Sequence, residues 1–266
     1  MTYNQAMTAL PDRRPAMDIL IPAAMTFLVM LAFTTSSNAQ TQTVWQGHSW
    51  KITNGGMAGV APGSPGNVSV DSNGYLHLSI KKDGETWTAA ELFTVDGLGF
   101  GTFQWLVEGK VWEMDPVTVL GLFPYGPVHG IGKDATNEID IEFSQWNNTC
   151  ACNADFTVYP TVARDHGKSS YELNFKVDQG TTLTTARMVW SSSSIVFTLM
   201  SGDQPIGTTA NVLKTATYTP SEAADIPQQP IPVGINLWAF KAVPATNQSV
   251  IIRSFQYVPR AATNHD

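Results

Sequence analysis

Apolar and polar residues alternate along short segments that recur through most of the chain. This period of two residues is that of a β-strand, which turns successive side chains to opposite faces. Clusters of Gly, Pro, Asn and Ser separate the segments, as turns do. The pattern predicts an all-β, antiparallel sandwich, with one short helical piece expected at residues 220–225. The clearest alternating segments are residues 75–80, 102–111, 171–177, 195–199 and 249–257.

The most informative of these patterns is Glu-Ile-Asp-Ile-Glu-Phe at residues 138–143. On a strand, Glu138, Asp140 and Glu142 share one face, which predicts a cleft, and the apolar residues share the other, which predicts a core. The Cα atoms of the two glutamates would lie roughly 13 Å apart at about 3.3 Å per residue. If each side chain reaches roughly 4 Å toward the other, the carboxyl groups are about 5 Å apart, as in retaining glycosidases.

A structural interpretation of the same acids is an amphipathic edge strand with a solvated acidic face, and the motif also arises by chance. Three like charges side by side cost stability, and the chain contains only 22 acidic residues. Together with the β-branched and aromatic residues on the other face, this favours a catalytic cleft.

Length and composition fit one domain with a sizeable core, because the chain has 266 residues, of which 43% are hydrophobic. Residues 1–39 differ from the rest: two arginines precede an apolar run over residues 19–33, and small residues end at Ala39. A membrane anchor is the alternative, but the run is short for a spanning helix and contains Pro22. We expect a secretory signal peptide at residues 1–39, cleaved near Ala39-Gln40, and a secreted domain, extracellular or periplasmic, at residues 40–266.

The charge argues against one class of partner. The net charge is −7, and it stays −7 without residues 1–39, which hold two acidic and two basic residues. A moderately acidic chain without a Lys/Arg cluster is a poor nucleic-acid binder. A neutral polysaccharide raises no such objection.

The two cysteines of the chain, Cys150 and Cys152, are two residues apart. In an extended strand their Cα atoms would be near the limit for a disulfide, so a bridge requires a tight turn. Metal binding by two thiolates alone would need other ligands, which the sequence does not show. The sequence leaves open a small local disulfide and two free thiols.

Four segments resemble glycoside hydrolase family sixteen, the β-jelly-roll endoglucanases that include lichenases, laminarinases and xyloglucan-active enzymes. Residues 137–143, Asn-Glu-Ile-Asp-Ile-Glu-Phe, resemble the active-site strand of this family. Residues 121–127 are similar to the strand and loop that precede it in lichenases. Residues 234–238 and 252–258 are similar to the Asn-Leu-Trp strand and the closing strand. The match in order and spacing implies a β-jelly-roll sandwich with a concave substrate cleft.

The resemblance also implies a role for each acid. Glu138 is expected to be the nucleophile, and Glu142 the general acid and later the base. The charge of Asp140 is expected to help keep Glu142 protonated while Glu138 is ionised, because neighbouring carboxylates push their pKa values apart. The alternative for Asp140 is a solvated strand residue.

Aromatic and polar residues near this strand are candidates for binding sugar rings. The resemblance implies substrate contacts for Trp238, in the Asn-Leu-Trp strand, and for Glu91. The alternatives are a place in the core for each aromatic residue and a surface salt bridge for Glu91. The tryptophans at positions 45, 50, 105, 112 and 190 are assigned to the core or the sheet surface. The full candidate set is Glu91, Phe123, Tyr125, Trp146, Asn236 and Trp238.

Substrate preference follows from details of the resemblance. Laminarinase-type members usually have an extra residue between the Asp and the second Glu, which forms a β-bulge, whereas Asp140-Ile141-Glu142 has none. With the lichenase-like residues 121–127 and a chain that ends soon after Pro259, this favours mixed-linkage β-1,3-1,4-glucan over xyloglucan. Three departures from the family predict altered subsite preference or weaker activity: Thr136-Asn137 before the nucleophile, no His and Tyr in residues 184–190, and Thr198 in place of an aromatic residue.

The sequence thus predicts a secreted, monomeric, retaining endo-β-glucanase with no required cofactor and no catalytic metal. A structural calcium ion held by oxygen ligands stays open. The alternatives are a xyloglucan- or β-1,3-glucan-active family member and a non-catalytic carbohydrate-binding jelly roll. The complete Glu-Asp-Glu set favours the enzyme, because a binding module gains nothing from three mutually repelling acids.

Overall fold

Strands form most of the structure, a computed structural model that describes residues 41–126, 135–178 and 182–261. The predicted signal peptide at residues 1–39 lies outside the described residues. Described residues fall within one compact unit, Asn38–Asp266. No helix in this part of the chain is long and apolar enough to cross a membrane. The short 3-10 helices are η1 (Pro65–Asn67), η2 (Val111–Glu113), η3 (Trp146–Asn148), η4 (Asp165–Gly167) and η5 (Ala223–Asp225).

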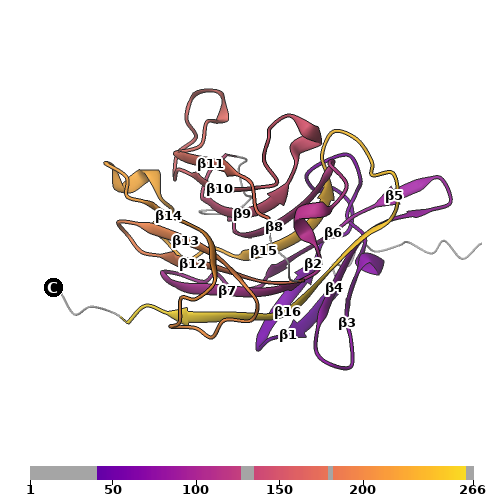
Figure 1. The fold of residues 1–266 in the computed structure, drawn as a ribbon, viewed down its shortest axis with the longest axis horizontal. Helices are drawn as coiled ribbons and strands as arrows, with labels where there is room; N and C mark the ends of the chain where they lie inside the picture. Colours follow the sequence, from indigo (N-terminus) through magenta and orange to yellow (C-terminus); the bar gives the residue numbers. More distant parts are fainter. Residues whose placement is uncertain (1–40, 127–134, 179–181, 262–266) are drawn as a thin grey trace, which may run out of the picture. The chain divides into compact units, whose positions relative to one another are not determined.

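The strands form two antiparallel sheets, which Figure 1 shows as stacked layers. Strands distant in sequence are neighbours in each sheet, as in a jelly roll, so the predicted antiparallel β-jelly-roll sandwich is confirmed. The first sheet has the order β1 (Thr41–Trp45), β2 (His48–Ile52), β6 (Ala90–Thr94), β15 (Val233–Ala239), β8 (Thr118–Pro124), β9 (Glu138–Ser144), β10 (Ala154–Tyr159), β11 (Tyr171–Phe175). The second has the order β14 (Val212–Tyr218), β13 (Ile195–Ser201), β12 (Leu183–Trp190), β7 (Gly101–Glu108), β16 (Gln248–Pro259), β4 (Leu76–Asp83), β3 (Val68–Val70), with β5 (Thr86–Thr88) paired to β4.

The core lies between the facing sides of the two sheets, because alternate residues of each strand point inward. Phe156 of β10 stacks on Phe197 of β13 with 4.6 Å between ring centroids, which joins the sheets directly. Trp50 of β2 meets Phe255 of β16 edge to face at 5.6 Å. The five tryptophans assigned to the core or the sheet surface are all buried.

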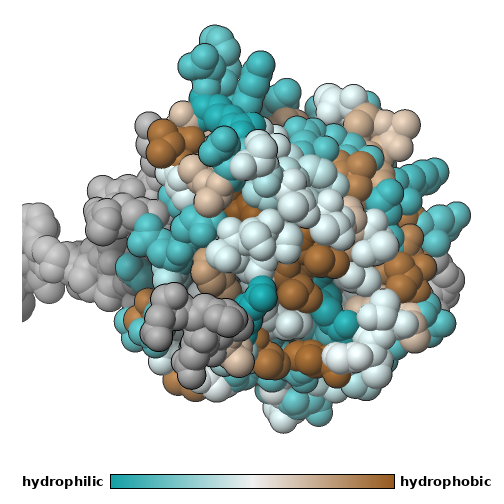
Figure 2. Space-filling model, turned by 90° about the vertical axis from the view of Figure 1, so that its left-hand side faces the viewer, coloured by the Kyte–Doolittle hydropathy of each residue, from teal (hydrophilic) through white to brown (hydrophobic). Residues whose placement is uncertain are grey.

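The surface carries only scattered hydrophobic residues. Figure 2 shows small, separate hydrophobic patches between polar residues on the face in view. Among the described residues, the exposed large hydrophobic side chains are all valines, which is ordinary for a protein surface. The five alternating segments correspond to β4, β7, β11, β13 and β16, and the short helical piece expected at residues 220–225 corresponds to η5.

Candidate active site

Strand β9 lies inside the first sheet, between β8 and β10, so it is not an edge strand. Its pairing with β10 is continuous from Glu138 to Glu142, which confirms a regular strand without a bulge. Ile139, Ile141 and Phe143 are fully buried on the core side. The three acids are therefore on the opposite side, as the alternation predicted.

These acids form the floor of a cleft of about 720 Å³ on the first sheet. Glu138 and Glu142 remain partly exposed in the cleft, whereas Asp140 is only 4% exposed. Strands β6, β8, β15 and β10 supply most of the other lining residues. The lining residues are Gly56, Met57, Ala58, Glu91, Phe93, Phe123, Tyr125, Ala135, Glu138, Asp140, Glu142, Tyr159, Asn236 and Trp238.

Five of the six predicted substrate-binding residues lie in this lining, and two of them form a polar pair. Glu91 and Asn236 are directly opposite each other on β6 and β15. Thr53 donates a hydrogen bond to Glu91 at 2.8 Å, and burial raises the pKa of this carboxyl, while hydrogen bonds from Thr53 and Asn236 lower it. The salt bridge considered for Glu91 is not its role here, since its partners are neutral groups.

Glycines keep the floor of the cleft open beside these side chains. A Cβ atom on Gly121 would lie 2.5 Å from Oδ1 of Asn236, and one on Gly234 would lie 2.6 Å from the ring of Phe123. Gly121 also pairs directly with Glu142 across β8 and β9. Its backbone N–H donates to Asn236 Oδ1 at 3.1 Å, so the bare backbone holds a cleft side chain in place.

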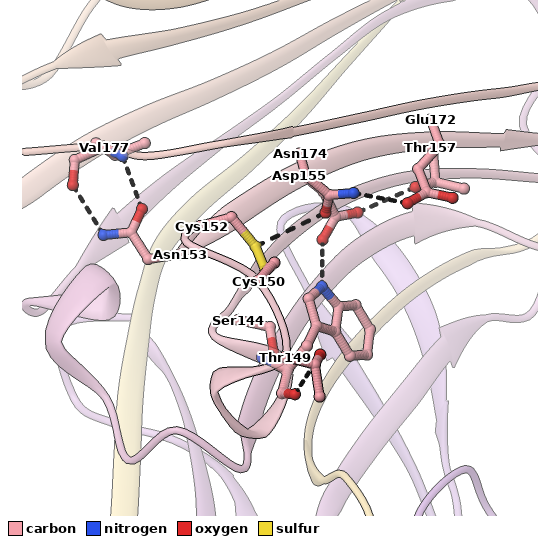
Figure 3. Close-up of a disulfide and its surroundings, with 11 residues drawn as sticks. Ser144, Thr149, Cys150, Cys152, Asn153, Asp155, Thr157, Glu172, Asn174 and Val177 are labelled. Atoms are coloured by element: carbon pink, nitrogen blue, oxygen red, sulfur yellow. Dashed lines mark hydrogen bonds between the residues drawn. A yellow bond between two sulfur atoms is a disulfide. The ribbon is translucent and has the colours of Figure 1, made fainter.

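Trp146, the sixth predicted substrate-binding residue, lies outside the lining of this cleft. Trp146 begins η3, where three consecutive residues have φ between 47° and 59°. This left-handed turn directs the indole toward β10, and Nε1 donates to Asp155 Oδ2 at 2.9 Å (Figure 3). The ring also meets Trp238 at 6.1 Å and Phe240 at 5.0 Å. Trp146 therefore contacts Trp238 of the cleft lining and holds Asp155, the direct partner of Glu142.

Burial and mutual repulsion shape the acid–base properties of the floor. The pKa of Asp140 is raised well above its ordinary value, first by burial and then by the charges of the flanking glutamates and Asp155. The pKa of Glu142 is also raised well above its ordinary value, first by burial and then by Asp155 and Glu138. Asp155 and Glu138 thus add to the repulsion between Asp140 and Glu142 that the sequence predicted. A carboxyl that keeps its proton in this way is suited to general-acid chemistry.

Strand β10 contributes residues that the sequence analysis did not select. Asp155, Thr157 and Tyr159 pair directly with Glu142, Asp140 and Glu138. Burial raises the pKa of Asp155 to about 7, and it raises that of Tyr159 as well. Polar residues alternate with apolar ones in Ala-Asp-Phe-Thr-Val-Tyr, so the signal was present, but the pairing register that places it beside the acids was not visible.

The cysteines form a disulfide in the connection between β9 and β10 (Figure 3). Cys150 and Cys152 have Cα atoms 5.2 Å apart, which the turn after η3 makes possible. Of the two alternatives left open by the sequence, the structure shows the disulfide. The bridge lies close to Asn174 of β11, with Cys152 Sγ 3.8 Å from Asn174 Oδ1.

Two of the three departures from the family lie away from the cleft. Residues 184–190 belong to β12, and Thr198 belongs to β13, both in the second sheet. Neither segment lines the cleft, and the predicted change in subsite preference or activity stays a prediction. Thr136 and Asn137, in contrast, are buried in the turn that leads into β9. Asn137 has a φ of 53° there.

Comparison with known proteins supports the fold. Neither a protein-family model nor a curated sequence matches the chain. Among solved structures, a β-1,3-1,4-glucanase (lichenase) from a mouse hindgut metagenome is 24% identical, with a TM-score of 0.56 over 79% of this chain and 93% of that one. A glycosyl hydrolase family 16 protein from Mycobacterium smegmatis is 20% identical, with a TM-score of 0.55 over 79% and 91%. A Mycobacterium tuberculosis protein described as a pseudo β-1,3-glucanase is 18% identical, with a TM-score of 0.58 over 79% and 91%.

The chain therefore has the jelly-roll fold of the family-sixteen β-glucanases, with a cleft that contains three acids on strand β9. Within the described ranges, no group of His, Cys, Asp and Glu side chains is arranged to hold a metal ion.

Proposed function

We propose that the protein is a retaining endo-β-glucanase that cleaves mixed-linkage β-1,3-1,4-glucan. One observation carries this proposal: Glu138 and Glu142 lie on the same face of a regular strand at the floor of the cleft. Two carboxyl groups about 5 Å apart are the requirement of double displacement. The similarity to lichenase and other family-sixteen structures supports the same chemistry.

In the proposed mechanism, Glu138 attacks the anomeric carbon, and the bond from this carbon to the leaving oxygen breaks. Glu142 gives its proton to that oxygen, so the released sugar leaves neutral and the other part stays on Glu138 as a glycosyl ester. Glu142 then takes a proton from water, and the resulting oxygen nucleophile attacks the same carbon and frees Glu138. The raised pKa of Glu142 supports its role as the acid.

Amide substitutions test the assignment. Glu138→Gln removes the proposed nucleophile, and Glu142→Gln removes the proposed general acid. We expect each to lower turnover of barley-type glucan by about 10²–10⁴-fold or more. Glu85→Gln is the matched control, because Glu85 is 97% exposed in the β4–β5 hairpin. Reducing-end release measures all three, with circular dichroism to confirm folding. Activity of either cleft variant within about tenfold of wild type would contradict the mechanism.

Stereochemistry gives a second test. Double displacement inverts the anomeric carbon twice, so the first-formed product of a β-glucan should be the β-anomer. Proton NMR during the first minutes of hydrolysis distinguishes the anomers before they equilibrate. An initial α-anomer would show that a water molecule attacks directly, which contradicts a nucleophilic Glu138.

The substrate is proposed from the regular strand β9 and the lichenase-like Phe123-Pro124-Tyr125 segment beside it. We expect faster release of reducing sugar from mixed-linkage glucan than from laminarin or xyloglucan at equal mass concentration. Faster hydrolysis of laminarin would show that the absence of a bulge does not govern linkage preference. The proposed location is outside the cell, and N-terminal sequencing of the secreted protein should begin at or near Gln40.

The second candidate is a carbohydrate-binding jelly roll without turnover. The observation in its favour is the similarity to a protein described as a pseudo β-1,3-glucanase. This candidate predicts glucan binding by calorimetry that is unchanged in Glu138→Gln, and no reducing ends from any β-glucan. The mutual repulsion of the floor acids argues against it, since binding alone does not require an acid with a raised pKa.

A further inference from the structure

A fourth carboxyl group, that of Asp155, adjoins the proposed general acid from the neighbouring strand. Asp155 of β10 pairs directly with Glu142 of β9. Side chains in such a pair have Cβ atoms about 4.5–5.5 Å apart. Asp155 is only 2% exposed, so water screens its charge from neighbouring groups only weakly. The two carboxyl groups are thus direct neighbours on a largely buried surface.

Two donors favour the ionised form of Asp155. Trp146 Nε1 donates to Oδ2 at 2.9 Å, and Thr157 Oγ1 donates to Oδ1 at 3.0 Å. Each carboxylate oxygen therefore has a fixed donor, and both hydrogen bonds lower the pKa of Asp155 against the effect of burial. Hydrogen bonds to a charged carboxylate stabilise it more than bonds to a neutral acid.

The other ionisable groups around Glu142 are also acidic. Asp140 and Glu138 share its strand, and Tyr159 is on β10 with Asp155. On the other side, β8 presents Gly121, and Glu91 follows beyond Asn236. On β11, Glu172 acts on Asp155 and raises its pKa. Every charge in this set opposes ionisation of Glu142, but Asp155 is the carboxyl that is both held by two donors and paired directly with Glu142 on the neighbouring strand.

Resting on the proposed hydrolase mechanism, we propose that Asp155 is a positioning residue that keeps the proton on Glu142. The negative charge of an ionised Asp155, stabilised by its two donors and directly beside Glu142, opposes loss of the proton from Glu142. Glu142 in this way stays loaded as an acid at a pH where an isolated glutamic acid is ionised. The Trp146 turn contributes to this role through its hydrogen bond to Asp155.

Asp155→Asn tests this role, because the amide keeps the size of the side chain and an oxygen that can accept from Trp146. We expect the alkaline limb of the pH profile of kcat/KM to move about one pH unit toward acid, as removal of a neighbouring charge does. Asp83→Asn is the matched control, since Asp83 is exposed at the end of β4. A purely structural Asp155 would leave the limb within about 0.3 pH units of wild type, which would overturn the proposal.

A second readout is independent of turnover. The carboxyl carbon of Glu142 can be followed by ¹³C NMR during a pH titration and assigned by its loss in Glu142→Gln. The midpoint of the Glu142 titration should fall by about one pH unit in Asp155→Asn. It should fall by less in Trp146→Phe, because this variant removes one donor to Asp155, so that Asp155 keeps its own proton to a higher pH. Trp146→Phe also serves if Asp155→Asn does not fold.

The NMR titration separates this inference from the function on which it rests. A changed midpoint in a protein that hydrolyses no β-glucan would support the link between Asp155 and Glu142 and overturn the proposed function. An unchanged midpoint in an active enzyme would overturn the role of Asp155 and leave the proposed function standing.

Discussion

The two sheets differ in how they surround their buried charged side chains. On the outer side of the second sheet, Arg187 of β12 is 6% exposed and donates to Gln104 Oε1 at 2.7 Å. It also donates to the carbonyl oxygens of Thr208 at 2.7 Å and Pro205 at 2.9 Å. On the first sheet, the acids of the cleft are crowded against one another instead, and every cause acting on Asp140 and Glu142 raises their pKa.

The difference separates a structural cluster from a functional one. Arg187 joins β12 to the loop at residues 202–208 with a neutral acceptor for each of three nitrogen atoms, and within the described ranges it has no carboxylate partner. Such a group stabilises the fold because its hydrogen bonds replace those of water. The cleft acids have protonation states that the fold maintains at a cost, which is typical of active sites.

The largest effect on stability should follow from breaking the arginine cluster. Arg187→Ala leaves the buried Gln104 Oε1 without its donor and removes the hydrogen bonds to the carbonyl oxygens of Thr208 and Pro205. We expect a loss of about 3 kcal/mol, or about 6–12 °C in Tm. Turnover of the folded protein should not change. Arg164→Ala is the control, because Arg164 pairs with Asp225 near the surface and such pairs contribute about 0–1 kcal/mol. Equal melting of the two variants would contradict a stabilising role for the buried guanidinium.

A smaller effect of opposite sign should follow from neutralising the cleft. A carboxyl whose pKa is raised on folding costs no stability below its unfolded pKa of about 4, and the cost grows as the pH rises toward the folded pKa. When the folded pKa exceeds the unfolded pKa by one, the full cost is about 1.4 kcal/mol. Because the pKa of Glu142 is raised on folding, we expect Glu142→Gln to match wild type at pH 4 and to melt at a higher temperature than wild type at pH 7.

Thermal melting at several pH values between 4 and 7 checks this prediction, with Glu85→Gln as the control that should follow wild type throughout. A Glu142→Gln protein that melts below wild type at pH 7 would show that Glu142 stabilises the fold. In that case the contrast with Arg187 would disappear.

The smallest effect should come from the disulfide between Cys150 and Cys152. The two cysteines are separated by one residue, so the bridge constrains the unfolded chain little, and we expect its loss to cost about 1 kcal/mol. Cys150→Ser/Cys152→Ser compared with wild type by thermal melting measures the loss. Turnover should stay within about twofold, because the hydrogen bond from Trp146 to Asp155 does not need the bridge. A large loss of activity with unchanged melting would show that the bridge positions Trp146.

The sequence was sufficient for β9 because strict alternation along its whole length defines both of its faces. It was insufficient for Asp155, whose role depends on the register between two strands joined by a turn. Trp146 was assigned to sugar binding because it is close to Glu142 in the sequence. Three left-handed residues bring its indole to Asp155, and no local pattern signals that hydrogen bond.

The same physical limit applies to Arg187 and to the family departures at residues 184–190. Alternation shows that a residue faces outward, but not which sheet its strand joins or which loop covers it. Both features depend on long-range pairing, and β12 pairs with β7, which is about 80 residues earlier in the chain. Register and sheet membership, rather than strand location, are what the sequence alone did not supply.

The unbroken pairing of β9 has an evolutionary consequence. Because both catalytic candidates are on one strand, the distance between them is set by the backbone and cannot be adjusted by point substitutions nearby. A single inserted codon between Asp140 and Glu142 would turn Glu142 toward the core unless the strand forms a bulge. The site should thus tolerate many substitutions around it and almost no insertions or deletions. A one-residue insertion that forms a bulge would then change the direction of the Glu142 side chain in a single step.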